Sequence, residues 1–311
     1  MKILLMYGFC LIFVLWTMKC FASQAQSPGI ASKYPGDIGI EADPAVVFAE
    51  NFEVPTLAEL TKHWHEVRNK NGEVISFTDD VPPNSSGKQS LKMVANLDRN
   101  TGGHLYKFLK PGCDELYFRF YVKFSPEHSY VHHFVHMSAN IDPRPWPEGH
   151  AGELSPGDIR FSTGIEPWGV WGRYPPPGVW NFYTYWQEMK MSRDGKYWGN
   201  SFAPERLIRV PRNQWICVEF MMKCNSEPGK NDGEQAFWID GDLAGRFGGF
   251  RWRSTNDLKL NTIWLLYYVT HDTMRQNRAA DPPKISWVWF DDVVVATKYI
   301  GPIKPPSGED E

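Results

Sequence analysis

Three segments in the middle of the chain carry side chains that can transfer protons or hold an anion. They span residues 131–137, 158–166 and 181–187. Side chains of a strand alternate between two faces, so one face of each segment is polar: His132 and His136; Arg160, Ser162 and Glu166; Tyr183, Tyr185 and Gln187. A cleft lined by these three faces would contain a base, an acid and a cationic clamp for a carboxylate.

These residue types lead to specific roles. The catalytic candidates are His132 or His136 as base, Tyr183 or Tyr185 as acid, Arg160 as clamp, and Ser162 beside them. The candidates for substrate binding are Glu166, Trp168, Trp171, Gln187, Lys190, Tyr267 and His271. No metal or other cofactor is required for this set of groups to transfer protons.

Other readings of the same residues stay open. The histidines, with Glu166 on the next strand, could bind a metal, but His132 and His136 would lie about 13 Å apart on a strand, too far for one ion. They could also be hydrogen-bonded at a sheet edge without a function, and a Tyr-x-Tyr pair is common in any sandwich. A glycosidase needs Glu166 and a second carboxylate, and the chain has no Glu-x-Asp-x-x-Glu cluster.

The elements that must position these groups are strands. Residues 116–124 alternate apolar and polar side chains, which predicts a half-buried strand, and residues 216–223 repeat the pattern. Residues 263–269 are apolar on both faces, as in a central strand. The pair Asp240-Gly241 predicts a hairpin turn. Only residues 56–64 indicate a helix, with Leu57, Leu60 and Trp64 on one face.

Many strands and almost no helix predict an all-β fold, a jelly-roll β-sandwich of the concanavalin A-like lectin/glucanase type with two antiparallel sheets. Residues 46–301 show no internal repeat and are expected to form one domain. Residues 26–45, rich in Pro, Gly, Ser and Ala, indicate a linker, and residues 302–311 a polar tail.

The first 25 residues have the features of a signal peptide: Lys2, an apolar run over residues 3–18, and small residues at Ala22 and Ala25. An uncleaved anchor is the alternative. We therefore expect a secreted or periplasmic protein that leaves the membrane when the signal is cleaved. Three cysteines follow the signal, Cys113, Cys217 and Cys224, and their spacing matches no metal motif, although one disulfide would be compatible with them.

The net charge of −3 gives no reason to expect nucleic-acid binding, which usually needs a basic face. The aromatic content is 15%, with 14 Trp. Most of these rings fill the core, but the loops 142–150 and 168–180 combine Trp with many Pro and Gly. Such stiff loops would make walls for sugar stacking, with burial of the rings as the alternative.

The second half of the chain resembles the alginate and glucuronan lyases of polysaccharide lyase family 14. The resemblance lies in residues 215–225, 228–233, 237–241, 249–253 and 289–295. It implies a jelly roll and a secreted lyase that cleaves an acidic, uronate-containing polysaccharide by β-elimination. A non-catalytic carbohydrate-binding or surface protein, or a glycoside hydrolase, is the alternative. We expect a monomer.

The catalytic half departs from the family pattern. The family's catalytic lysine stands in a Gly-Gly-Lys-Leu-Pro-Gly-like stretch, but the corresponding residues 131–137 contain no lysine. Ser162 matches the family's serine, whereas Gly164 stands where its arginine would be, with Arg160 the nearest substitute. Tyr183 and Tyr185 match the family's Tyr-x-Tyr strand. Finally, Asp291 and Asp292, with Glu50 or Glu53, are candidate oxygen ligands for a structural Ca²⁺, a solvated acidic strand end being the alternative.

Overall fold

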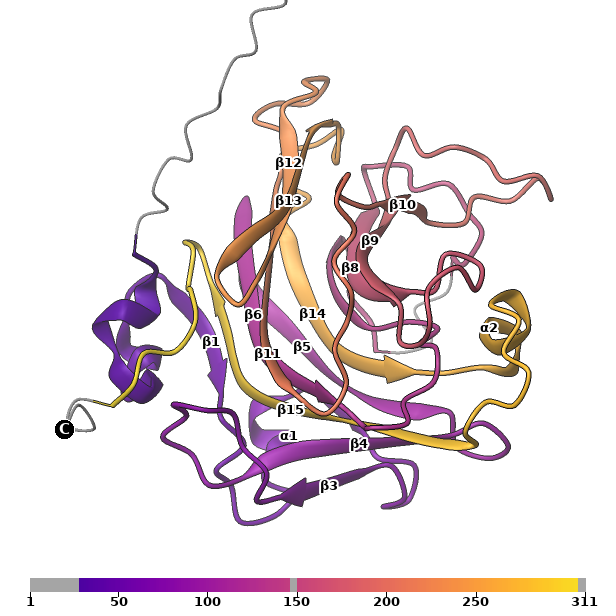
Figure 1. The fold of residues 1–311 in the computed structure, drawn as a ribbon. Coiled ribbons are helices and arrows are strands. Elements are labelled where there is room, and N and C mark those ends of the chain that lie inside the picture. The colour runs from indigo at the N-terminus through magenta and orange to yellow at the C-terminus, as the bar shows by residue number, and fades with distance from the viewer. Residues whose placement is uncertain (1–27, 146–149, 307–311) are drawn as a thin grey trace, which may run out of the picture.

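Two antiparallel sheets form the body of the protein, as the strand periodicity predicts (Figure 1). The computed structural model describes residues 28–145 and 150–306. The first sheet has the order β13 (Asp242–Phe250), β12 (Gly233–Ile239), β11 (Trp215–Lys223), β6 (Glu115–Phe124), β15 (Ile285–Ala296), β4 (Ser90–Asn96) and β3 (Ile75–Thr78), and β1 (Val46–Glu50) also pairs with β15. The second has the order β10 (Asn200–Phe202), β9 (Val179–Tyr185), β8 (Arg160–Trp168), β7 (Val135–Asn140), β14 (Leu260–Tyr268), β5 (Gly102–Cys113) and β2 (Glu66–Arg68).

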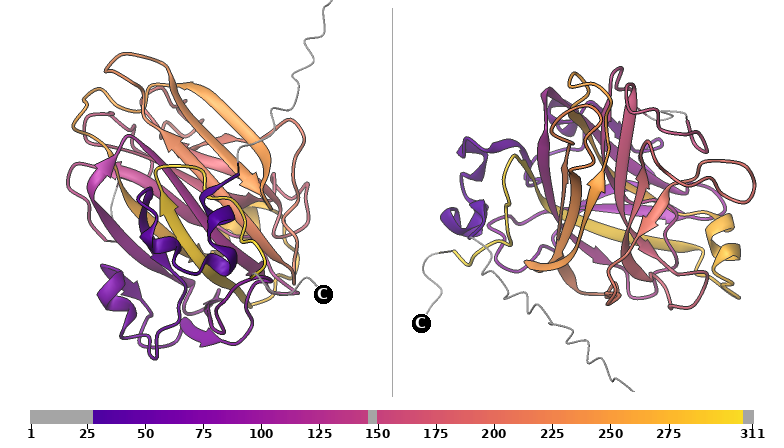
Figure 2. Two further views of the ribbon diagram at one scale, coloured as in Figure 1. Left: turned by 90° about the vertical axis from the view of Figure 1, so that its left-hand side faces the viewer. Right: turned by 90° about the horizontal axis from the view of Figure 1, so that it is seen from above.

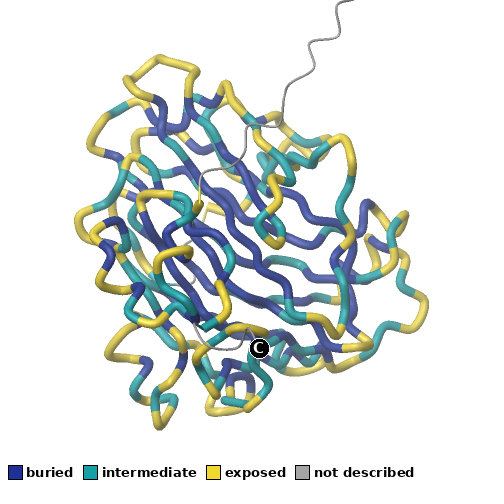
Figure 3. Tube along the Cα trace, turned by 60° about the vertical axis from the view of Figure 1, so that its left-hand side comes forward, coloured by how far each residue is buried: buried dark blue, intermediate teal, exposed yellow. Residues whose placement is uncertain are grey.

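The core lies between the two sheets, where strands are dark blue in Figure 3. The predicted alternation of β6 is confirmed, because its inward residues Leu116, Phe118, Phe120, Val122 and Phe124 are all fully buried. Phe120 packs against Phe134 of the opposite layer, and Phe182 packs against Phe220 in the same way. The aromatic residues of the two layers therefore hold the sheets face to face.

The turn between β12 and β13 also agrees with the sequence. Asp240 and Gly241 both have positive φ, 51° and 87°. Two successive residues of this kind match the right-handed twist of a hairpin.

Helices are short and more numerous than expected. Within residues 56–64, only α1 (Leu60–His63) is helical, and Leu60 and Trp64 are buried as predicted. A second helix, α2 (His271–Gln276), was not foreseen; Thr270 caps it by accepting a hydrogen bond from the Thr273 main-chain N–H. No helix among the described residues is long and apolar enough to cross a membrane.

Residues 28–45 are folded, so the interpretation of residues 26–45 as a linker is wrong. They form three short 3₁₀ helices, η1 (Ile30–Lys33), η2 (Pro35–Asp37) and η3 (Ile40–Ala42). They lie beside the C-terminal segment in both views of Figure 2, and main-chain hydrogen bonds join Ile30 to Tyr299 and Ala31 to Ile300. The Pro/Gly-rich composition here reflects tight turns rather than flexibility.

These terminal segments cover the outer face of β6, which the sequence indicates to be exposed. Arg119 is fully buried there, and it forms an ion pair with Asp37 and donates to the main-chain oxygens of Asp292 and Gly301. Ile303, in the predicted polar tail, is also buried, and its main-chain N–H donates to the Tyr121 hydroxyl at 2.9 Å. The predicted signal peptide lies outside the described residues.

Candidate functional site

A groove crosses the outer face of the second sheet. Two cavities form it, and they share His133 and Leu266. The lining of one consists of His133, His136, Ser138, Ala139, His150, Ala151, Arg160, Phe161, Ser162, Tyr183, Tyr185, Trp264 and Leu266. The lining of the other consists of Arg68, Lys70, Thr101, Gly102, Gly103, His104, His133, Leu266, Tyr267 and Tyr268.

Strand register explains why the predicted groups meet. Across β7, β8 and β9, His136 lies beside Gly164 and Gly164 beside Tyr183, while the next row joins Ser162 to Tyr185. The tyrosine hydroxyls are 3.4 Å apart. His136, the two tyrosines, Ser162 and Arg160 therefore line one cavity, with Arg160 at the Ser162 end.

The histidine segment departs from the strand alternation that was predicted for it. His133, not His132, shares a face with His136. Trp264 pairs with His136 but Tyr268 pairs with His133, so five residues of β14 (264–268) oppose four of the histidine segment (133–136). This one-residue slip changes the face to which His133 points.

His132 points away from the groove, so the prediction that it shares a face with His136 is wrong. Its Nδ1 lies 2.6 Å from the Thr273 hydroxyl and 2.9 Å from that of Thr270, at the start of α2. Burial lowers the pKa of His132 to about 4, so the ring is neutral at physiological pH. It holds α2 against the sheet edge.

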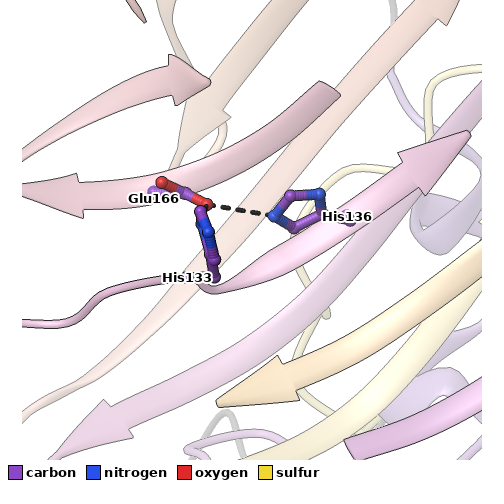
Figure 4. Close-up of side chains that lie close together, drawn as sticks. All are labelled: His133, His136 and Glu166. Carbon is purple, nitrogen blue, oxygen red and sulfur yellow. Dashed lines mark hydrogen bonds and ion pairs between the residues drawn. The ribbon is translucent and has the colours of Figure 1, made fainter. Parts of the chain in front are cut away.

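Glu166 joins the two groove histidines (Figure 4). Its Oε1 is 2.9 Å from Nδ1 of His133 and 3.0 Å from Nε2 of His136. The carboxylate is 6% exposed. Burial acts to raise the pKa of Glu166, but the two histidines outweigh it and lower that pKa to about 2. The ionised carboxylate therefore fixes both imidazole rings.

Gly164 creates the space for this arrangement. A Cβ atom built on Gly164 would lie only 2.5 Å from Nε2 of His136. Any side chain at this position, including the arginine expected from the family pattern, would collide with the ring. The imidazole thus occupies the place of the missing side chain, and Gly164 is a steric requirement of the His136–Glu166 contact.

The ends of the groove are cationic. Arg160 lies at one end, and Arg68 and Lys70 at the other. Burial and the neighbouring Arg68 lower the pKa of Lys70. No Asp or Glu is among the described residues of the lining, although Glu153 lies 3.5 Å from Arg160 and Glu66 lies 3.5 Å from Arg68. This charge distribution suits an anionic chain laid across the sheet.

An aromatic floor that was not predicted from the sequence connects the two ends. Trp264 stacks on His104 with ring centroids 6.2 Å apart and lies at the same distance from His136. His104 in turn bonds to Glu66 at 2.8 Å. The alternation of residues 263–269 contains the signal: once Ile263 and Leu265 are assigned to the core, Trp264, Leu266 and Tyr268 must face outward.

The other predicted binding residues lie elsewhere. Trp168 and Trp171 contact each other at the far end of β8, with ring centroids 5.1 Å apart, and Trp171 is exposed. Gln187 donates to the main-chain oxygen of Arg251, and Lys190 is exposed near β10. His271 pairs with Asp98. None of these side chains lines the two cavities of the groove.

Tyr267 belongs to the lining of the second cavity, but its side chain is fully buried and packs in the core, because it shares a face with Ile263 and Leu265. Its hydroxyl donates to Nε2 of His128 at 2.8 Å, and Nδ1 of His128 donates to the main-chain oxygen of Ser129 at 2.7 Å. Both ring nitrogens of His128 are thus engaged in the neutral form. Burial lowers the pKa of His128 to about 3.

We therefore expect His128 to make the stability of the fold sensitive to acid. The unfolded chain takes up a proton at this histidine near pH 6.5, whereas the folded chain does so only near its pKa of about 3. Stability is full above pH 6.5 and falls as the pH decreases towards 3, by up to about 1.4 kcal/mol per pH unit from this group. Urea unfolding of the protein and of His128→Gln across this range should show the steeper decline in the unsubstituted protein; equal slopes would contradict the assignment.

Asp291 and Asp292 lie on β15 in the first sheet, away from the groove. Both are buried, the main-chain N–H of Asp292 donates to Oδ1 of Asp291 at 2.8 Å, and both Oδ2 atoms lack a hydrogen-bond partner among the described residues. Burial raises the pKa of Asp292 to about 6. Glu50 and Glu53 accept hydrogen bonds from other groups, including the Trp64 indole and the Gln89 main chain respectively. Asp291 and Asp292 are therefore buried acids rather than a solvated strand end.

The three cysteines of the described chain are free thiols, and two of them, Cys217 and Cys224, are buried. Burial raises the pKa of the Cys224 thiol to about 12. The fold therefore holds together without a disulfide among the described residues.

Comparison with known proteins shows which solved structures have a similar fold. No family model and no curated protein matches the chain. Among solved structures, the marine PL-14 alginate lyase from Aplysia kurodai matches with a TM-score of 0.60 and 14% identity, covering 81% of this chain and 99% of that one. Alginate lyase vAL-1 from Chlorella virus matches at 0.56 and 15%, covering 79% and 99%.

A mutant of alginate lyase Aly36B in complex with alginate tetrasaccharide also matches, at a TM-score of 0.56 and 12% identity, covering 82% of this chain and 98% of that one. The match covers almost the whole length of each of these three proteins. The similarity therefore extends over both sheets and is not limited to the second half of this chain. The chain has the jelly-roll β-sandwich fold of these alginate lyases, with a sequence that has diverged far from theirs.

Proposed function

We propose that the protein is a secreted polysaccharide lyase that cleaves a uronate-containing glycan by β-elimination. The observation that carries the proposal is the groove itself: two adjacent tyrosine hydroxyls, a histidine–carboxylate group and an aromatic floor lie between cationic ends. The shared fold with alginate lyases, one of them solved with an alginate tetrasaccharide, supports it.

The reaction needs three functions in one place. A cationic or hydrogen-bonding group must neutralise the C6 carboxylate, so that the C5 proton becomes acidic. A base then takes that proton, the C5 electron pair forms the C4–C5 double bond, and the C4–O4 bond breaks. An acid gives a proton to the leaving O4.

The groove offers a group for each function. Burial raises the pKa of Tyr183 well above its usual value, so its hydroxyl is a proton donor for O4. Tyr185, beside it on the same face of β9, is placed to take the C5 proton while its own hydroxyl proton passes to Tyr183, whose hydroxyl is 3.4 Å away and gives a proton to O4. The rings of His133 and Tyr183 are 5.3 Å apart, so the His133–His136–Glu166 group faces the same sugar and can interact with its C6 carboxylate. Arg160, Arg68 and Lys70 hold neighbouring uronates.

The direct test is incubation of the purified protein with a panel of uronic-acid polysaccharides, including alginate and glucuronan, and with neutral glycans as controls. Product is read by the ultraviolet absorbance of the unsaturated uronate. We expect absorbance to rise with at least one acidic polymer and with no neutral one. Binding to these polymers without any absorbance change would instead identify a carbohydrate-binding protein. New reducing ends without absorbance would identify a hydrolase.

Secretion and assembly form part of the same proposal. Expression with the native N-terminus should release protein whose first residue follows Ala22 or Ala25, as read by N-terminal sequencing, and light scattering should give the mass of a monomer. Retention of the full-length chain in the membrane would contradict cleavage.

A structural calcium ion at Asp291 and Asp292 is a separate proposal, supported by the two buried carboxylate oxygens that have no hydrogen-bond partner in the described part of the chain. Calcium at a free concentration of 100 times its Kd should raise the free energy of unfolding by about 2.7 kcal/mol. Thermal unfolding with calcium or with a chelator would show this as a shift that Asp292→Asn removes. An identical Tm in both conditions would exclude it.

A further inference from the structure

We propose that His133, His136 and Glu166 form a binding site for one divalent transition-metal ion of the zinc type, open towards the groove. The same three residues explain the hydrogen bonds of Figure 4, but their arrangement also satisfies the demands of a metal. Among the described residues, no other group of three histidine, cysteine or acidic side chains comes together in this way.

The donor distances carry the proposal. The Glu166 oxygen is 2.9 and 3.0 Å from the two imidazole nitrogens, and all three donor atoms lie within 4.8 Å of one another. Around a tetrahedral zinc ion with bonds of about 2.0–2.1 Å, ligand atoms lie about 3.3 Å apart. An ion can therefore enter if the Glu166 oxygen moves a few tenths of an ångström away from each nitrogen and the two imidazole rings turn to bring their nitrogens, which lie within 4.8 Å of each other, to a similar separation.

The chemistry of the donors selects the metal. Two neutral imidazoles and one carboxylate are ligands for zinc and related transition metals, whereas calcium and magnesium prefer oxygen donors alone. Three protein ligands leave a fourth position free, as in catalytic rather than structural zinc sites. Here the free position faces the groove, because His133 and His136 line it and Glu166 lies beneath them.

The scaffold around the three ligands is rigid. His136 and Glu166 lie on the neighbouring strands β7 and β8, and His133 is held by its bridge to Tyr268. Asn181 on β9 donates to the Glu166 main-chain oxygen at 3.0 Å, which fixes β8 at this point. Ligands on paired strands need little reorganisation to bind an ion.

The role of the ion rests on the proposed function. The family pattern places an arginine where this chain has Gly164, and the His136 ring fills that space. A metal ion between the histidines and Glu166 would restore a cation there and bind the C6 carboxylate of the substrate as a Lewis acid. Proton transfer then falls to Tyr183 and Tyr185, since both histidines serve as ligands.

Metal binding can be measured without any substrate. The purified chain, treated with a chelator and then dialysed, is titrated with Zn²⁺ by calorimetry and with Co²⁺ by visible absorption. We expect one ion per chain and the absorption of a low-symmetry Co²⁺ site. Each of His133→Ala, His136→Ala and Glu166→Gln should weaken binding by more than about 100-fold, since even supporting residues of metal sites contribute 10–100-fold.

His132→Ala is the matched control, because this neighbouring histidine bonds to Thr273 and not to Glu166. It should keep one ion per chain. Gly164→Ala leaves all three ligands in the chain but displaces the His136 ring, and it should also weaken binding. Circular dichroism establishes that each variant is folded. Failure of the unsubstituted protein to bind Zn²⁺ or Co²⁺, or equal binding by all variants, overturns the inference.

The metal site and the lyase activity can fail separately. Stoichiometric Zn²⁺ binding without elimination on any polymer would leave the site standing and remove the proposed function. Full lyase activity in protein shown by elemental analysis to be metal-free would leave the proposed function standing and remove the role of the ion in the reaction.

Discussion

Tyr183→Phe should lower the turnover of β-elimination by about 10²- to 10⁴-fold, the usual contribution of a positioned acid or base. The substitution removes only the hydroxyl, so the ring still packs beside His133 and Tyr185. Without it, the leaving O4 departs as an alkoxide or takes a proton from water. The loss should appear in kcat, with KM changed little, because the hydroxyl acts mainly in the transition state.

Tyr117→Phe is the control for this experiment. Tyr117 is also partly buried and its hydroxyl bonds to Glu115 at 2.9 Å, but it lies on β6 in the first sheet. This variant should retain full turnover on the polymer that the panel identifies. Tyr185→Phe should show a loss comparable to that of Tyr183→Phe, as both protons must move. Turnover within threefold of the unsubstituted protein for both groove variants would refute the tyrosine assignment.

Local periodicity was sufficient for the strands that build the core. Five alternate residues of β6 fill the interior as predicted, and the Asp240-Gly241 pair closes its hairpin. These features depend on neighbours in the chain, through the period of two and through turn conformation. The same regularity, followed along β14, also places Trp264 in the groove.

The site could be predicted only in part, because its geometry depends on how strands pair. Tyr183, Tyr185, Ser162 and Arg160 lie in regular strands, and simple alternation brings them to one face. His133 reaches that face only through the one-residue slip against β14. Nothing within residues 131–137 marks that slip, since it is a property of two strands together. The predicted separation of about 13 Å therefore applied to His132 and His136, whereas the histidines that meet at Glu166 are His133 and His136.

The prediction of a linker from the composition of residues 28–45 was wrong for a different reason. Proline and glycine are frequent both in flexible linkers and in tight turns packed on a surface. What distinguishes the two here is the burial of Ile30 and Ile40, and the contact between Asp37 and Arg119. The position of Arg119 in the middle of a strand does not indicate that Asp37, far away in the sequence, forms an ion pair with it.

Arg119→Met is expected to lower the free energy of unfolding by about 3–5 kcal/mol, because it leaves a partner of a buried ion pair uncompensated. The Asp37 side chain is 7% exposed and Arg119 fully buried. The main-chain oxygens of Asp292 and Gly301 would lose their donor in the same step. Urea unfolding followed by tryptophan fluorescence measures the change.

Arg144→Met provides the matched control, since its ion pair with Asp142 is 70% and 67% exposed. Exposed pairs contribute at most about 1 kcal/mol. The double variant Asp37→Leu/Arg119→Met should recover part of the loss, because it removes both buried charges together. If Arg119→Met costs no more than Arg144→Met, the N-terminal segment does not seal this face of the sheet in solution, and its interpretation as a linker would be restored. A large loss with partial recovery means that residues 28–45 belong to the folding unit that supports the groove.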